Sequence, residues 1–481
     1  MNKLMTALSQ SVLVKGVLLL LLILLLCIPL GSVQSLINER SRSADEATAE
    51  LAQTYVGPQV LMGPVLQVPY VERWQTREPT AKGKPDKVVE HAVTRVALWF
   101  PHEWKLSGEM KPEERYRGLF TVLFYQLHGQ AEGSFAAFDT NTLERQEKNS
   151  RIDIGTPVLT LSVSDLRGLQ GAPQLSVLGQ TLNFERQPAS LPERGALTAG
   201  VHAPLTGAAL AAFRAGQALP FALQLTLTGQ ESLAMVPLGD DTDVQLHSSW
   251  PHPSFGAQFL PTERTVTETG FDAHWRVAAL TSRAREQLRA TISSGGKGDD
   301  AIDAARPASG PLGQIEQFDV SFIQPVNVYS MADRAVRYGF LFVALTLLAV
   351  FMVELFARLR LHPVQYALVG LSIAVFFLLL IALSEKLGFA VAYAGAAGAS
   401  VLLLLMYFSA VLRSAQRGAL LAGFVAVLYG ALYGLLASES HALMLGALLV
   451  FGMLATLMLA TRHVNWWALG QRPSAGADAS P

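Results

Sequence analysis

The stretch GVLLLLLILLLCIPLGSV, Gly16 to Val33, decides the class of this chain. It carries no charged residue, and a helix that crosses a bilayer needs about 20 mostly apolar residues. Its apolar core is longer than the roughly 7–15 residues of a signal peptide, and no clear small-x-small cleavage site follows it. The bulky Leu26 before Cys27 argues against lipoprotein processing. The stretch therefore predicts an uncleaved membrane anchor.

Five further apolar runs lie near the other end of the chain. Their approximate bounds are Tyr338–Phe356, Val364–Leu383, Phe389–Leu412, Ala419–Ala437 and Ala442–Thr461. Small residues recur at four-residue spacing in two of the runs, and such residues let helices approach closely in lipid. These residues are Ala390, Ala394 and Gly398, and Gly430 and Gly434. The pattern predicts a packed bundle of five transmembrane helices.

The short loops between these runs alternate in charge. Two of them carry basic pairs, Arg358 with Arg360 and Arg413 with Arg417, whereas the other two carry one lysine between them. Basic residues favour the cytoplasmic side of the membrane. Six spans then place both termini in the cytoplasm and residues 34–337 in the periplasm.

Composition excludes several classes of protein. The 481 residues are 51% hydrophobic and only 16% charged, with a net charge of -1, whereas soluble domains carry roughly 25% charged residues. A nucleic-acid-binding protein would show a basic face, which this balance does not supply. The single cysteine, Cys27, excludes a disulfide or a cysteine metal site within one chain.

The region between the anchor and the later runs is dominated by strand patterns. Apolar and polar residues alternate in FALQLTLT (221–228) and VLTLSVS (158–164), which is typical of half-buried strands. Many short strands without alternating helices favour an antiparallel sandwich or barrel. Close to 300 residues is large for one core, which favours two packed β-subdomains. A short helix before this region should end at Gly57–Pro58, because proline cannot continue it.

The predicted fold class is therefore a membrane protein of α plus β type. Its N-terminal anchor precedes a large antiparallel β-rich periplasmic domain, and a bundle of five transmembrane helices follows. The predicted boundaries are 1–33 for the cytoplasmic N-terminus and first transmembrane helix, 34–337 for the periplasmic domain, 338–467 for the bundle and 468–481 for a disordered cytoplasmic tail. Two polar, broken segments inside the domain are predicted as loops, Gln75–Lys87 and the flexible Ser293–Gly313.

One segment of the β-rich region, SSWPHPSFGAQFLP (248–261), combines a histidine with aromatic residues. Trp250 and His252 both precede prolines, which drives them out of the helical region into extended backbone. The apolar residues available to pack this segment are Phe255, Phe259 and Leu260. The other histidines of the region, His202, His247 and His274, show no HxH or HExxH spacing. We therefore expect a structural corner rather than a catalytic or metal site.

Other candidate residues also favour structural explanations. The motifs GxSxG and GxxxxGK[ST] are absent. Asp240, Asp241 and Asp243 lack the later Gly and Glu of an EF-hand, so they predict an acidic hairpin turn. Glu354 lies within an apolar run, where a buried acid suggests function, but an ion pair with Arg358 four residues on is the simpler account. The sequence thus predicts no catalytic, cofactor or metal residues.

Five stretches of the chain resemble the CreD family of bacterial inner-membrane proteins, also called cell envelope integrity proteins. They are GPQVLMGPVLQVPY (57–70), SSWPHPSFGAQFLP (248–261), GFDAHW (270–275), DRAVRYGFLFVALT (333–346) and RLHPVQYALVGLSIAVFFLLLIALSEKLGF (360–389). The resemblance covers nearly the whole chain in order. It implies a Gram-negative envelope protein linked to the Cre two-component regulon and to envelope stress, and it implies no reaction and no site residues.

Three functions are compatible with these patterns. The favoured one is a non-enzymatic envelope-stress factor that lies among inner-membrane lipids, whose periplasmic domain contacts unknown cell-wall or envelope components and which needs no cofactor. A lipid or small-molecule transporter would need a polar cavity in the bundle, for which the candidates are Tyr393, Tyr407, Tyr429 and Tyr433. A membrane-bound envelope hydrolase would need a clustered nucleophile and base, and a pocket with converging titratable groups is not visible in the sequence.

Overall fold

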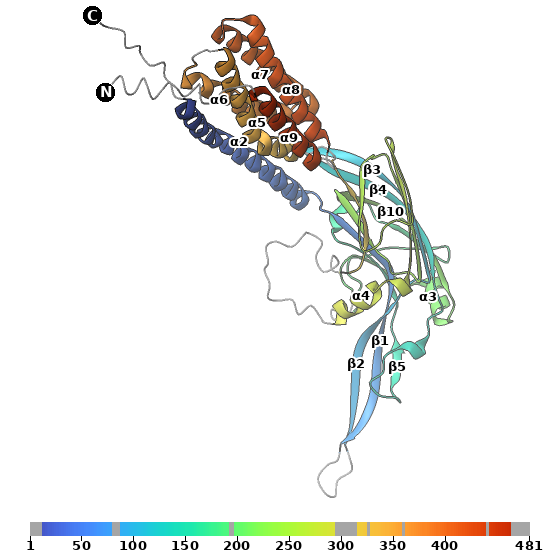
Figure 1. Ribbon diagram of the computed structural model, residues 1–481. Helices are drawn as coiled ribbons and strands as arrows, with labels where there is room; N and C mark the ends of the chain where they lie inside the picture. The colour runs from blue at the N-terminus through green and yellow to red at the C-terminus, as the bar shows by residue number, and fades with distance from the viewer. Residues whose placement is uncertain are drawn as a thin grey trace, which may run out of the picture. The chain divides into compact units, whose positions relative to one another are not determined.

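A computed structural model describes residues 12–78, 87–191, 197–293, 315–324, 328–357, 361–438 and 442–462. The chain divides into two compact units (Figure 1). The helical unit consists of Met1–Asp45 and Val326–Pro481, and the β-rich unit consists of Glu46–Pro325. The predicted tail 468–481 lies outside the described residues. Of the predicted loop Ser293–Gly313, only Ser293 is described.

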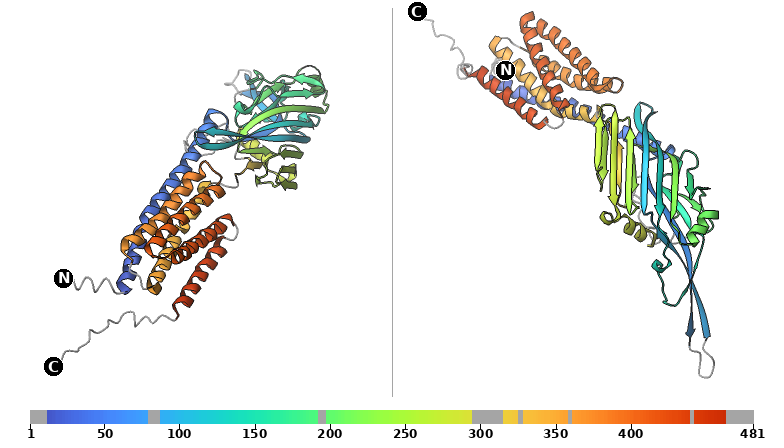
Figure 2. Two further views of the ribbon diagram at one scale, coloured as in Figure 1. Left: turned by 90° about the horizontal axis from the view of Figure 1, so that it is seen from above. Right: turned by 90° about the vertical axis from the view of Figure 1, so that its right-hand side faces the viewer.

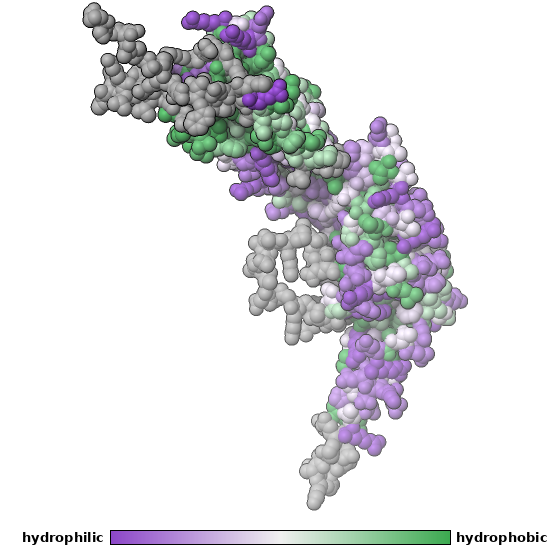
Figure 3. Space-filling view, in the orientation of Figure 1, coloured by the Kyte–Doolittle hydropathy of each residue, from purple (hydrophilic) through white to green (hydrophobic). Residues whose placement is uncertain are grey.

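The helical unit is built from long apolar helices. They are α2 (Val12–Thr54), α5 (Val328–Ala357), α6 (Pro363–Ser384), α7 (Phe389–Val411), α8 (Ala415–Ala437) and α9 (Ala442–Thr461). In the described chain, all of these except α9 are long and apolar enough to cross a membrane. Helix α9 has 20 residues and occupies the sixth predicted span. Apolar side chains gather over the visible surface of these helices (Figure 3).

Two helices of this unit are longer than predicted. Helix α2 runs without interruption through Pro29 to Thr54, so the anchor and the short helix after it are one element of 43 residues. Its end just before Gly57–Pro58 agrees with the stop expected from the proline. Helix α5 begins at Val328 rather than Tyr338. The segment 34–337, predicted as periplasmic, therefore includes the end of α2 and the first turns of α5 as well as the β-rich unit, which covers 46–325.

The small residues singled out in α7 and α8 do not mediate helix packing as predicted. A β-carbon added at Gly430 or Gly434 would meet no other part of the described chain within 4 Å, and Ala390, Ala394 and Gly398 are exposed. The buried face of α7 lies two residues away, with Ala392, Ala396 and Ser400 turned inwards. Four-residue spacing was present on both faces of the helix, so spacing alone could not select the packed one.

The β-rich unit contains two sheets of eight strands each. Sheet A has the order β13-β16-β11-β1-β6-β9, with β2 and β5 also paired to β1, and sheet B has the order β14-β15-β12-β3-β4-β10-β7-β8. The strands are β1 (Gln59–Glu78), β2 (Lys87–Trp99), β3 (Glu103–Arg117), β4 (Phe120–Phe135), β5 (Arg151–Ile154), β6 (Val158–Val163), β7 (Gln174–Val177), β8 (Gln180–Leu182), β9 (Val201–Pro204), β10 (Leu219–Gln230), β11 (Ser232–Val236), β12 (Asp241–Ser248), β13 (Pro253–Ala257), β14 (Glu263–Thr267), β15 (Gly270–Ala278) and β16 (Phe318–Phe322). Two helices complete the unit, α3 (Gly207–Arg214) and α4 (Ala284–Ser293).

One apolar core joins the two sheets. Leu61 and Leu66 of β1 lie in the same buried cluster as Trp104 of β3 and Leu225 of β10. On the other face of sheet A, a second cluster includes Met62 and the α4 residues Ala284 and Leu288. Because both faces of β1 are covered, the first part of this strand is apolar throughout and does not alternate between apolar and polar residues. The two sheets share a core, whereas the sequence favoured two subdomains.

The pairing of strands is mostly antiparallel, as predicted, but two pairs are parallel. They are β1 with β11 and β12 with β3. Parallel neighbours require long connections, which local alternation of residues cannot reveal. Strand β1 also continues to Glu78 and β2 begins at Lys87, so the predicted loop Gln75–Lys87 is strand at both ends. This long hairpin is seen at the foot of Figure 1.

Candidate functional site

The first polar site of the helical unit surrounds Glu354 in the last turn of α5. This carboxylate is only 4% exposed and forms an ion pair with Lys15 of α2. It also accepts hydrogen bonds from the Tyr366 hydroxyl of α6 and from the backbone N–H of Leu361, the latter at 3.3 Å. We call these four residues the Glu354 cluster. The predicted partner, Arg358, lies outside the described residues, and the observed partner comes from the other end of the chain.

A second polar site joins the same three helices. The Gln34 side chain of α2 donates to Asp333 of α5, which also pairs with Arg337 at 2.6 Å. Arg40 of α2 lies 3.3 Å from Glu385, the residue that follows α6. We call these five residues the Asp333 cluster. Each of its described charges has a partner of opposite sign.

The distance between the two clusters matches the thickness of a bilayer. Lys15 and Gln34 lie about 19 residues apart on α2, or roughly 28 Å at the rise of an α-helix. Glu354 and Asp333 lie about 21 residues apart on α5, or roughly 32 Å. The hydrocarbon core of a membrane is about 30 Å thick. The two clusters are therefore separated along α2 and α5 by about the thickness of one bilayer.

Tyrosine hydroxyls join α7 to α8 by hydrogen bonds. The Tyr393 hydroxyl donates to the backbone oxygen of Tyr429 at 2.7 Å, and the Tyr429 hydroxyl lies 3.0 Å from Ser400 Oγ. Tyr433 is 38% exposed, and its ring lies 5.2 Å from that of Tyr393. Three of the four tyrosines considered for a transport path are thus engaged in packing between α7 and α8.

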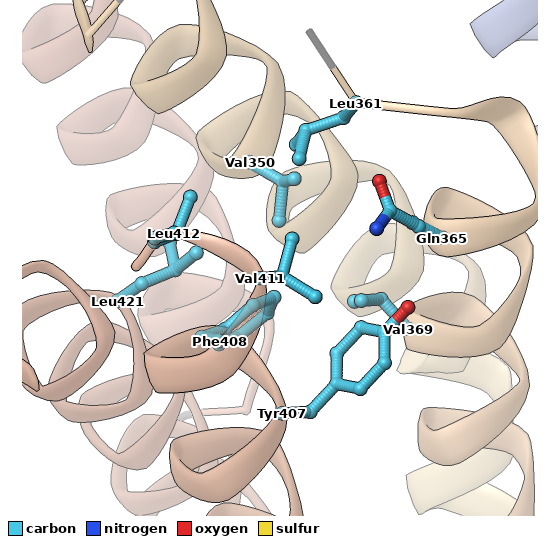
Figure 4. Close-up of a pocket in the computed structure, with 9 residues that line it drawn as sticks. All are labelled: Val350, Leu361, Gln365, Val369, Tyr407, Phe408, Val411, Leu412 and Leu421. Carbon is cyan, nitrogen blue, oxygen red and sulfur yellow. The ribbon is translucent and has the colours of Figure 1, made fainter. Parts of the chain in front are cut away.

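The fourth, Tyr407, lines a small apolar cavity (Figure 4). The other lining residues are Val350, Leu361, Gln365, Val369, Phe408, Val411, Leu412 and Leu421. Its volume of about 10 Å³ suffices for roughly one water molecule. Binding sites for small molecules usually measure about 300–1,000 Å³. This cavity is too small for a transported substrate.

Histidines of the β-rich unit pair with aspartates. His247 lies 2.9 Å from Asp272, and His274 lies 2.8 Å from Asp243. Catalysis of acyl transfer would add a hydroxyl or thiol on the other ring nitrogen. In the part of the chain that the structure describes, neither pair has a Ser, Thr or Cys in that position. Among the same described residues, no three His, Cys, Asp or Glu side chains are grouped so that they could hold a metal ion.

The acidic segment 239–244 is also used for ion pairs. Asp240 pairs with His102 at 2.9 Å and with Arg285 at 2.7 Å. The hydrogen bond that the His102 ring donates to Asp240 raises the pKa of His102. Asp241 is the first residue of β12 and Asp243 lies within that strand, so only Asp240 precedes it. Asp241 and Asp243 lie on the same face of β12, because residues two apart in a strand point to the same side, whereas Asp240 is held outside the strand by His102 and Arg285.

The segment at 248–261 forms a corner beside β16. The half-buried Trp250 ring donates from Nε1 to the backbone oxygens of His252 (3.1 Å) and Ile323 (3.2 Å). Its ring lies 6.0 Å from that of Phe322. The His252 side chain is exposed, and its ring lies edge-on to the Trp250 ring, with 6.4 Å between the ring centroids. The expected packing of Leu260 is wrong, since that residue is 64% exposed.

A buried polar network around His202 could not be recognised in the sequence. The His202 ring is 1% exposed and lies 2.9 Å from Thr160 Oγ1 and 3.2 Å from the Thr198 oxygen. Gln67 donates to Thr160 at 2.7 Å and to the Leu197 oxygen at 2.9 Å. Burial lowers the pKa of His202. The one signal was a glutamine inside an otherwise apolar strand, VLQVP.

Comparison with known proteins agrees with these observations. The family model described as "Inner membrane protein CreD" matches residues 11–467. The chain is 34% identical over 447 residues to "Inner membrane protein CreD" of Escherichia coli (strain K12). That alignment covers 93% of this chain and 92% of the relative.

Proposed function

The chain belongs to the CreD family of inner membrane proteins, and we propose that its helices form a fixed anchor for a periplasmic, ligand-binding β-rich unit. In this role the protein is a non-enzymatic envelope factor. The β-rich unit contacts components of the cell wall or envelope, and the helices hold it at the inner membrane during envelope stress.

The observation that carries this proposal is the use of polar groups in the helical unit. The Glu354 and Asp333 clusters join α2, α5 and α6 through groups of opposite charge. A transporter needs polar groups that face a water-filled path near the middle of the membrane. Here the hydroxyls of Tyr393 and Tyr429 are both bound within the protein, that of Tyr429 to Ser400 near the middle of α7. This arrangement favours an anchor over a path for substrates.

The β-rich unit supports a binding role better than a hydrolytic one. Its histidine–aspartate pairs lie on the outer face of sheet B, where β12 and β15 are neighbours. Both members of the His247–Asp272 pair are 58% exposed, whereas a catalytic base is usually placed in a cleft that shifts its pKa. Binding through an open sheet face requires no such cleft.

Thiol labelling tests the orientation. We would replace the native Cys27 by serine and introduce cysteine at Thr265 in β14 or at Gln416 at the start of α8, both of which are exposed. A membrane-impermeant maleimide should label Thr265→Cys on intact spheroplasts and Gln416→Cys only after permeabilisation. The reverse pattern would place the β-rich unit in the cytoplasm and refute the proposal.

A further inference from the structure

The outer face of sheet B carries a shallow groove of about 290 Å³. It lies over β4 and β10 beside β7, and the right-hand view of Figure 2 looks onto this sheet. The lining residues are His128, Gly129, Gln130, Gln170, Ala172, Gln174, Gln224, Leu225 and Thr226. The volume is at the lower end of the range of about 300–1,000 Å³ found for ligand sites. Unlike the cavity in the helical unit, it can hold a ligand fragment.

Strand register aligns the glutamines of this groove in a row. Gln174 of β7 is paired with Gln224 of β10, and Gln224 is paired with Gln130 of β4. The same row continues through Ser107 of β3 to Gln245 of β12. All five side chains are exposed, and directly paired residues stand side by side on one face of a sheet. At a strand spacing of about 4.8 Å, the row is roughly 19 Å long.

The chemistry of the groove selects an uncharged, polar ligand. An amide side chain offers two N–H donors and an oxygen acceptor. In the described chain, the amides of Gln130, Gln174 and Gln224 have no hydrogen-bond partner. The lining contains no Lys, Arg, Asp or Glu, so it lacks the cations that recognise phosphate. Its few apolar residues also leave little surface for an acyl chain.

Backbone pairing distinguishes a glycan from a peptide. A peptide that binds by strand addition needs the free edge of a sheet. Strand β4 lies between β3 and β10, β10 lies between β4 and β7, and β7 lies between β10 and β8. The backbone groups of β4 and β10 are therefore engaged on both sides, and β7 pairs with β8 over Leu175–Val177, so side chains must recognise a ligand that lies across these strands. Sugar hydroxyls, which both donate and accept, complement amide side chains in this way.

We propose that this row of amides binds a neutral, linear glycan laid across the strands. The spacing of neighbouring strands is close to the length of one sugar residue in an extended 1,4-linked chain, so successive sugars would meet successive amides. The imidazole of His128, the one aromatic ring of the lining, lies beside the row and offers a surface for a sugar ring. The inference deepens the proposed function, because a periplasmic unit would meet such glycans.

Binding can be measured with full-length protein in detergent micelles and chitohexaose, a neutral 1,4-linked glycan, by isothermal titration calorimetry. A shallow site with few contacts should give a Kd of about 0.1–1 mM. Gln130→Leu and Gln224→Leu should each weaken binding about fivefold, since each removes amide hydrogen bonds from the site. The matched control is Gln126→Leu, on the same face of β4 but roughly 13 Å along the strand from Gln130, which should bind as the wild type does.

Several results would overturn the proposal. They are no binding of chitohexaose by the wild type, equal losses in the control and the two groove variants, or preferential binding of an uncharged extended peptide. Thermal unfolding checks that the variants are folded. If a leucine variant does not fold, threonine is introduced at the same position, because it removes the amide and favours strands. Because the measurement uses purified protein, it does not depend on orientation. A reversed labelling pattern with intact glycan binding would refute the periplasmic placement alone.

Discussion

Replacing Lys15 by methionine should destabilise the helical unit more than replacing Glu354 by glutamine. Among the described residues, Lys15→Met leaves the Glu354 carboxylate, 4% exposed, with the hydrogen bonds of Tyr366 and Leu361 alone. Glu354→Gln retains one oxygen, which can accept from the Leu361 N–H, and its amide N–H can donate to the oxygen of Tyr366 in place of the bond that the tyrosine donates. It also leaves a lysine that is 33% exposed and can turn its ammonium towards water.

The two single substitutions therefore differ in magnitude. Removing one partner of a fully buried pair costs about 3–5 kcal/mol. Lys15 is one third exposed, so we expect about 3 kcal/mol for Lys15→Met, at the lower limit of that range. Glu354→Gln should cost about 1 kcal/mol, the value of a typical hydrogen bond. In the double variant no charge is left alone, so its cost should be close to that of Glu354→Gln, which gives a coupling energy of about 3 kcal/mol.

Reversible unfolding in mixed micelles of dodecyl maltoside and sodium dodecyl sulfate measures these differences, with helical circular dichroism as the signal. The control is Arg337→Met, which removes the basic partner of another acid in α5. Its side chain is 72% exposed and pairs with Asp333 within one helix, so the cost should be about 0.5 kcal/mol or less.

Two outcomes would refute the reasoning. If Lys15→Met costs no more than Arg337→Met, the Glu354 carboxylate is not held by Lys15. If the double variant is destabilised by the sum of the single changes, the two groups act independently, and the interhelical ion pair contributes nothing.

Three further predictions concern other parts of the chain. Trp250→Ala should lower the free energy of unfolding by about 2–3 kcal/mol, because the ring is half-buried, and His252→Gln should lower it by less than about 0.5 kcal/mol. Membrane abundance and thermal unfolding measure both effects. Similar losses of stability in the two variants would contradict a structural corner built on Trp250. Burial lowers the pKa of His202, so as the pH falls this histidine is protonated in the unfolded chain before it is protonated in the folded protein. The stability that depends on its neutral form should therefore be complete above about pH 7 and fall below about pH 6.5. Unfolding measured against pH should show a weaker pH dependence in His202→Gln. Tyr429→Phe with Ser400→Ala should cost about 0.6 kcal/mol and still complement a deletion strain under envelope stress; normal abundance without complementation would favour transport.

The layout of the fold could be predicted from the sequence because its signals are local. Composition separates the helices from the β-rich unit, and alternation in 221–228 and 158–164 places strands β10 and β6. Strand β1 was harder, since burial on both faces removes the alternation. The parallel pairs β1 with β11 and β12 with β3 could not be predicted, because they join segments that are distant in sequence and carry no pattern of their own.

The polar sites show the same limit more clearly. Glu354 is conspicuous as an acid within an apolar run, but its partner Lys15 is 339 residues away in the chain. The sequence alone pointed to Arg358, which is four residues away. The amide row on sheet B was equally hidden, because Gln130, Gln174 and Gln224 each look like an ordinary solvent-facing position. Only the register of three strands brings them side by side.

The two polar clusters have a role that the apolar residues of α2 cannot fill. Leu22, Leu26 and Leu30 are buried against the other helices, and Leu26 lies against Gly370. A shift of α2 by one turn, about 5.4 Å, in the direction that brings Leu18, Leu22 and Leu26 into these three places would replace each leucine by another leucine, so apolar packing there would change little. The same shift would break the contacts of Lys15 and of Gln34 together. Polar residues at both ends of the apolar stretch of α2 therefore specify the register of the anchor, and the loss of both should leave a helix that is inserted but no longer fixed against its neighbours.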